Sequence, residues 1–78
     1  MFDFDKLRGR IKEKLKTEAL FAEKISVTPA TLSYKFNGIS EFTSKEIEKA
    51  CSKEVLDIPL EEIGIYFFNK KLELNSRR

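Results

Sequence analysis

The side chains that usually perform catalysis are scarce in this sequence. It contains no histidine and one cysteine, Cys51, which excludes a His-based triad, a structural zinc site and an internal disulfide. Cys51 falls on an apolar helical stripe and is typical of a buried small hydrophobe. The acidic pairs at 3/5 and 61/62 are typical of solvated helix starts. The sequence therefore predicts that the protein is not an enzyme and needs neither a cofactor nor a metal.

A different chemistry is available between residues 29 and 37, where small and polar side chains share one face of a predicted helix. Groups of this size and polarity can contact a base edge or a phosphate, and a helix in the major groove reads bases with residues near its N-terminus. A plain helical hairpin whose small residues face water would explain the spacing equally well. The residues are Pro29, Ala30, Thr31, Ser33, Tyr34 and Asn37.

Apolar residues at spacings of three and four predict five helices that would carry these groups. Thr17, Thr28 and Thr43 are expected to cap three of them, with Thr43 and Glu46 forming a capping box. Proline at 29 suits the first position of a helix, and the Asn-Gly pair at 37–38 is a typical helix end. The predicted helices cover about residues 3–16, 18–25, 29–36, 44–53 and 59–68.

The same periodicity predicts which side chains are buried. Ala22 is small enough to let the second and third helices cross closely, opposite Leu32 in the third. The other expected core residues are Phe4, Leu7, Ile11, Leu15, Ala19, Phe21, Ile25, Val27, Phe36, Ile47, Ala50, Cys51, Leu60, Ile63, Tyr66 and Phe67.

Length and composition limit the fold to one small domain. The 78 residues are 41% hydrophobic and 36% charged, which favours a compact all-α domain over residues 1–68 and a charged tail over 69–78. The longest apolar runs, 19–22 and 65–68, fall far short of the roughly 20 residues that span a bilayer. We therefore expect no membrane association, and the single cysteine, which cannot form an internal disulfide, favours a reducing, cytoplasmic setting.

Charge is distributed unevenly along the chain. The formal net charge is +2, but residues 1–17 carry +3, residues 41–62 carry −4 and residues 63–78 carry +3. Such an asymmetry favours an anionic partner on one face. Solvated helix faces produce the same pattern, so charge alone does not decide the function.

The segment TEALFAEKISVTPATLSYKFNG, residues 17–38, resembles the helix-turn-helix of the lambda-repressor-like family, which includes phage repressors and Cro proteins. Ala22 matches the small residue of the first motif helix, and Leu32 matches the buried aliphatic of the recognition helix. The resemblance extends more loosely to about Phe68. It is greatest to the small Cro-like regulators of Gram-positive phages and prophages, several of which open with a sequence similar to FDFDKLRGRI at residues 2–11.

This resemblance implies a compact five-helix domain whose third helix enters the major groove of a palindromic operator and controls transcription. The implied partner is double-stranded operator DNA, bound in the bacterial cytoplasm at the nucleoid. The implied base contacts come from Thr28, Pro29, Ala30, Thr31, Ser33 and Tyr34. The implied phosphate contacts come from Lys16, Thr17, Glu18, Lys35 and Asn37.

Three positions depart from the family pattern. Glu18 stands where the family usually has glutamine, so a carboxylate would repel a phosphate there. Ser26 stands where the turn usually has glycine, so a left-handed backbone would be strained. Lys35 occupies a position that is often aliphatic, which leaves part of that packing to Phe36.

A module of this size reads about half of a useful operator, so we expect a homodimer on DNA. The expected dimer interface is the apolar C-terminal region, formed by Ile65, Tyr66, Phe68, Leu72 and Leu74. An alternative role uses the same fold to bind protein: an antirepressor or modulator that pairs with another phage repressor. The acidic residue at 18 favours this alternative, which predicts little operator binding at physiological salt.

Overall fold

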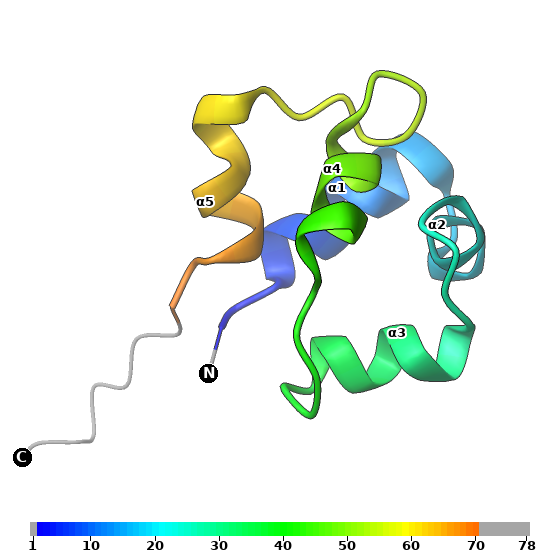
Figure 1. The fold of residues 1–78 in the computed structure, drawn as a ribbon. Helices are drawn as coiled ribbons and strands as arrows, with labels where there is room; N and C mark the ends of the chain where they lie inside the picture. Colours follow the sequence, from blue (N-terminus) through cyan, green and yellow to red (C-terminus); the bar gives the residue numbers. More distant parts are fainter. Residues whose placement is uncertain (1, 71–78) are drawn as a thin grey trace, which may run out of the picture.

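The computed structural model of the protein describes residues 2–70 (Figure 1). Within this range the chain forms helices and no strand; one isolated antiparallel bridge joins Phe2 and Lys70. The expected all-α class with five helices is confirmed. The elements are α1 (Asp5–Leu15), α2 (Glu18–Lys24), α3 (Pro29–Phe36), α4 (Ser44–Cys51), the 3-10 helix η1 (Leu60–Glu62) and α5 (Ile63–Phe67).

The starts of the three central helices are fixed by local side-chain hydrogen bonds, as the sequence predicts. The hydroxyls of Thr17, Thr28 and Thr43 each accept the backbone N–H three residues ahead at 3.1 Å. Glu46 Oε1 in turn accepts the Thr43 N–H at 2.9 Å, which completes the capping box. These bonds satisfy amide groups that have no partner in the first turn of a helix.

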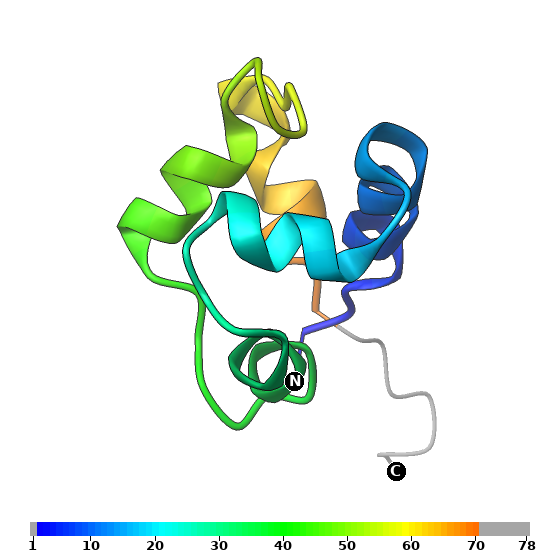
Figure 2. The same ribbon diagram turned by 90° about the vertical axis from the view of Figure 1, so that its right-hand side faces the viewer.

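The helices surround one core, to which α1 contributes Leu7, Ile11 and Leu15. α1 packs against both α2 and α5, and α2 also contacts α3 and α4. In Figures 1 and 2, α3 lies along the lower edge of the molecule, with no other helix of the described chain below it. One long face of α3 is therefore directed away from the rest of the fold.

α2 and α3 are in contact, and the two residues expected at their crossing are both buried. Ala22 has no exposed surface and Leu32 is 2% exposed. In the turn, the Val27 N–H donates to the Ala22 carbonyl at 2.9 Å. Ser26 has a φ of 66°, so the left-handed backbone anticipated for this residue is confirmed. Serine carries some conformational strain there that glycine would not.

Most of the predicted core is confirmed, with two corrections and one omission. Ala19 is exposed because it lies on the outer side of α2, and Leu20 is half-buried instead. Leu60 is 83% exposed, because η1 holds it outside the helical stripe to which it was assigned. The omission is a set of buried residues from the segment between α4 and η1: Val55, Leu56 and Ile58.

A cluster of aromatic rings closes the end of the molecule where both described ends of the chain meet. The rings of Phe4, Phe36 and Phe42 form a triangle with centroids 5.6–5.9 Å apart. Phe67 of α5 packs on Phe42 at 5.3 Å in an edge-to-face arrangement. Such pairs stabilise by about 0.5–1.5 kcal/mol beyond the area they bury. The cluster joins α1, α3, α5 and the loop between α3 and α4.

The last helix differs from its prediction. One helix was expected from Pro59 to Phe68, but η1 covers the first part and α5 is five residues long. Gly64, a poor helix former, is the second residue of α5. The fourth helix also ends earlier, at Cys51, where Ser52 takes an extended conformation.

The segment after α5 is joined to the N-terminal segment. The Asp3 N–H donates to the Asn69 carbonyl at 2.6 Å, and the rings of Phe2 and Phe68 meet edge to face at 5.7 Å. Leu72 and Leu74, two of the predicted dimer residues, lie outside the described residues. In the described chain, every helix is too short or too polar to cross a membrane.

Candidate nucleic-acid interface

The two faces of α3 differ sharply in burial. Leu32, Lys35 and Phe36 are 2–5% exposed and face the core. On the opposite side, Pro29, Ala30, Ser33 and Tyr34 are exposed, with 53% of Tyr34 accessible. The sequence predicted this division for all of these residues except Lys35. Four of the six predicted base-contact residues therefore lie together on an open helical face.

The two threonines of the predicted base-contact set make hydrogen bonds to each other at the start of α3. The Thr28 hydroxyl accepts the Thr31 N–H and donates to the Thr31 hydroxyl at 2.9 Å. Thr31 is half-buried, whereas Thr28 is exposed. Both side chains thus stabilise the first turn of α3, and they flank the open face at its N-terminal end.

Asn37 is placed at the other end of that face. It is the C-cap of α3, and Gly38 follows with a φ of 80°, a conformation that glycine adopts without strain. The Asn37 Nδ2 donates to Ser33 Oγ over a long 3.4 Å. Its side chain remains exposed and close to the predicted base-contact residues.

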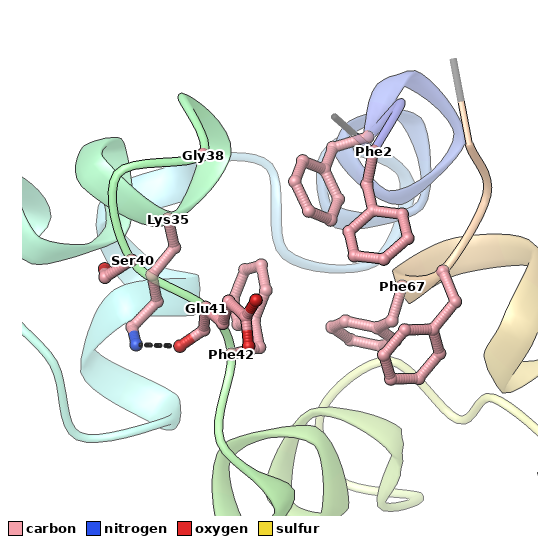
Figure 3. A pocket seen from close by; sticks show the side chains of 9 residues that line it. Phe2, Lys35, Gly38, Ser40, Glu41, Phe42 and Phe67 are labelled. Atoms are coloured by element: carbon pink, nitrogen blue, oxygen red, sulfur yellow. Dashed lines mark hydrogen bonds between the residues drawn. The ribbon is translucent and has the colours of Figure 1, made fainter. Parts of the chain in front are cut away.

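Lys35 requires a correction, because the structure removes it from the set of phosphate contacts. Its side chain is 6% exposed, and its Nζ lies 2.9 Å from Glu46 Oε1. The same ammonium donates to the Glu41 carbonyl at 2.9 Å and lies 5.7 Å from the Phe42 ring centroid. Figure 3 shows the side chain directed into the loop after α3. Lys35 is therefore an internal cation that ties the end of α3 to the start of α4.

The carboxylate that balances Lys35 has a shifted pKa. Burial by itself would raise the pKa of Glu46, but hydrogen bonds from Thr43 and Lys35, together with the charge of Lys35, outweigh burial and lower it. Glu46 is thus held as a carboxylate beside a buried ammonium. The pair satisfies both charges inside the fold.

The predicted contacts around the start of α2 form a second group. Lys16 and Thr17 are exposed, and the Thr17 hydroxyl is engaged as the helix cap. The Glu18 carboxylate is paired with Arg8 of α1, with 3.1 Å between Oε2 and Nε. Arg8 was not among the predicted site residues. Its Cζ lies 4.4 Å above the Phe36 ring, so it touches both α2 and α3.

A signal for Arg8 was present in the sequence. Arg8, Lys12 and Lys16 recur every four residues, which places the first two on one face of a helix and the third just beyond its end. Their place beside the start of α2 could not be read from this spacing, because it depends on how α1 and α2 pack.

The predicted dimer residues that the structure describes are accessible in part. Ile65 is 45% and Phe68 is 52% exposed, whereas Tyr66 is half-buried. Beside them lies a shallow groove between α4 and the η1–α5 segment. The apolar part of its lining comes from Ile47, Cys51, Ile58, Leu60, Ile63 and Phe68.

The one thiol of the sequence lies in this groove. Burial raises the pKa of the Cys51 thiol, which lowers the fraction of reactive thiolate. Over residues 2–70, no three His, Cys, Asp or Glu side chains come together in a way that could hold a metal ion.

No curated protein matches the chain. A model of the family described as "Protein of unknown function (DUF739)" matches residues 1–70. The chain is therefore a member of the DUF739 family.

Proposed function

We propose that this protein is a sequence-specific DNA-binding regulator of transcription that inserts α3 into the major groove of its operator. The observation that carries the proposal is the open face of α3, where Pro29, Ala30, Ser33 and Tyr34 are exposed while Leu32 and its neighbours anchor the helix. A helix that reads bases in the major groove must project from its domain in this way. α3 lies at the edge of the fold, as such a reader requires (Figure 2).

The junction of α2 and α3 supports a helix-turn-helix of the lambda-repressor-like kind. Ala22 is fully buried where the two helices meet, and a left-handed Ser26 reverses the chain between them. The cap by Thr28 and the proline at 29 define where α3 begins. This arrangement fixes α3 against α2 through its inner face and leaves its outer face for bases and phosphates.

The chemistry of the open face predicts how bases are distinguished. Ser33 can donate to or accept from a base edge, and Ala30 or Pro29 can pack on a thymine methyl. Since Lys35 is internal, no cation of α3 is available for bidentate contacts to guanine. Discrimination therefore relies on apolar contacts and on the shape of the operator, with Lys16, Thr17 and Asn37 at phosphates.

The proposed working form is a homodimer on two half-sites. The exposed apolar side chains of Ile65 in α5 and of Phe68 directly after it provide a surface for pairing. The setting is the bacterial cytoplasm, on nucleoid DNA. The proposal includes no catalytic step.

The test is a footprint of the purified protein across the intergenic DNA beside its own gene. We expect Ser33→Ala and Tyr34→Ala to lose specific protection while the helical circular-dichroism signal stays unchanged, because both side chains are exposed on α3. Ser44→Ala, the same substitution as the first on exposed α4, is the control and should protect like the parent. Protection of the parental sites by both α3 variants would refute the role of α3.

A protein-binding role remains a second candidate because of one feature. Tyr34 and Ile39 are 53% and 70% exposed at the end of α3, and the Ile39 N–H donates to the Tyr34 carbonyl at 2.9 Å. Large exposed apolar side chains near one helix end favour contact with a protein such as another phage repressor. This role predicts no protected DNA at physiological salt and a stable complex with that repressor.

A further inference from the structure

A basic cleft lies between α1 and the start of α2. It is lined by three cations and one carboxylate together with two uncharged residues: Arg8, Gly9, Ile11, Lys12, Lys16 and Glu18. Lys12 and Lys16 are exposed. An excess of positive charge in a concave surface attracts anions more strongly than the same charges on an open face.

Arg8 is the one cation of this cleft whose position is fixed from two sides. The Glu18 carboxylate lies 3.1 Å from its Nε, and its Cζ lies 4.4 Å from the centroid of the Phe36 ring. Within residues 2–70, the Nη1 and Nη2 groups donate to no other residue. Two parallel donors of a planar fork suit the oxygens of a phosphodiester.

The location of Arg8 links the two groups of expected phosphate contacts. The basic cleft contains Lys16 and Glu18, and a neighbouring depression is lined by Arg8 together with Asn37. Asp3 and Asp5 also line this second depression. Their negative charge directs an approaching phosphate toward the cleft side of Arg8, away from the start of α1.

We propose that the basic cleft is a phosphodiester-binding site, in which Arg8 and Lys12 contact the operator backbone and Glu18 is a positioning residue for Arg8. The inference rests on the proposed function and adds to it. It explains how a carboxylate can stand at a position where a phosphate is expected. Glu18 orients the guanidinium through Nε, and the remaining two nitrogens carry the contact.

The experiment measures how operator affinity depends on salt concentration. Each phosphate contact by a cation contributes about 0.9 to the slope of log affinity against log salt. We expect Arg8→Met and Lys12→Met each to reduce the slope by about this amount. Between about 50 and 200 mM salt, the affinity of each variant should therefore fall by a factor about 3.5 times smaller than that of the parent. Lys6→Met and Lys14→Met, the matched controls on α1 outside the cleft, should keep the parental slope.

The positioning role of Glu18 is tested by whether Glu18→Ala weakens or strengthens operator binding. With Arg8 present, Glu18→Ala should weaken operator binding several-fold, because the guanidinium loses its orientation. In the Arg8→Met background the same change should strengthen binding, because only the repulsion between carboxylate and phosphate is left to remove. Arg8→Lys keeps the charge without the fork, so it should retain the slope and still bind more weakly than the parent.

The outcomes separate the inference from the function on which it rests. If the parent protects its operator and both Arg8→Met and Lys12→Met keep the parental slope, the cleft is not a phosphate site, while the role of α3 stands. Equal effects of Glu18→Ala in both backgrounds would remove its positioning role. If the parent binds no duplex, both proposals fail. If Arg8→Met does not fold, Lys12→Met and Arg8→Lys test whether the basic cleft binds phosphate.

Discussion

At the scale of single residues, Glu46 links the start of α4 to the buried end of α3. One oxygen, Oε1, accepts both the Thr43 N–H and the Lys35 ammonium, each at 2.9 Å. We expect Glu46→Gln to lower the free energy of unfolding at neutral pH by about 1–3 kcal/mol, because a buried ammonium loses its counter-charge. Glu48→Gln, on an exposed side chain of the same helix, is the control and should change stability little.

The same residue predicts a dependence of stability on pH. The pKa of Glu46 is lowered from its ordinary value of 4.5, so its contribution is complete above that value and is lost as the pH falls through the folded-state pKa. Urea unfolding between about pH 3 and pH 7 should show a decline at acid pH that is shallower in Glu46→Gln. An identical decline in parent and variant would show that Glu46 is not a source of acid sensitivity.

Single residues also show where sequence reasoning reaches its limit. The capping threonines and the left-handed Ser26 were predictable, because each depends on neighbours within four positions along the chain. Lys35 was assigned to the surface, since a lone lysine on a polar segment is usually solvated. Its burial depends on the Glu41 carbonyl and Glu46 being folded back over the end of α3, which no local pattern encodes.

At the scale of elements, we expect the packing of α2 against α3 to depend on one small side chain. Ala22 has no exposed surface, so a larger residue must displace its neighbours. We expect Ala22→Leu to lower the free energy of unfolding by about 1–3 kcal/mol, a large share of the stability of a small domain. Thermal and urea unfolding followed by circular dichroism measure this loss.

Ala19→Leu is the matched control for that variant, since it makes the same change on the exposed side of the same helix. Its stability should stay within about 0.5 kcal/mol of the parent. If both variants were equally stable, the space around Ala22 would accommodate a leucine, and the close packing inferred for α2 and α3 would be wrong.

Elements far from a strong local signal were the least predictable. The segment between α4 and η1 contributes Val55, Leu56 and Ile58 to the core, although it has no helical period. It is held by Arg10 of α1, which donates to the carbonyls of Leu56 and Asp57 at 3.0 and 2.9 Å. An arginine 46 positions earlier in the chain thus shapes a loop whose burial the sequence did not reveal.

At the scale of the whole molecule, the proposed function assigns different roles to differently charged parts of the surface. The basic residues of α1 and the open face of α3 would meet DNA, whereas the acidic stretch 41–62, at −4, would avoid it. α5 packs against α1 and lies above α3, which forms the lower edge of the molecule in both views (Figures 1 and 2). A second copy bound through α5 would therefore leave the proposed reading face of each protomer unobstructed.

A substitution in α5 should therefore affect dimerisation without affecting the contacts between α3 and DNA. Ile65 is 45% exposed, so replacing it should leave the fold intact and remove apolar surface from the proposed dimer contact. We expect Ile65→Asn to bind a single half-site as well as the parent does, and to lose cooperative filling of an operator with two half-sites one helical turn apart. Sedimentation of the protein with each duplex measures how many copies are bound.

Ile39→Asn is the control for pairing, because it makes the same change at an exposed isoleucine outside α5. It should still place two copies on the full operator once enough protein is present to fill a half-site. If Ile65→Asn fills both half-sites with parental cooperativity, the two copies meet elsewhere or bind independently. In that case the exposed side chains of α5 would have to be assigned to a partner other than a second copy of this chain.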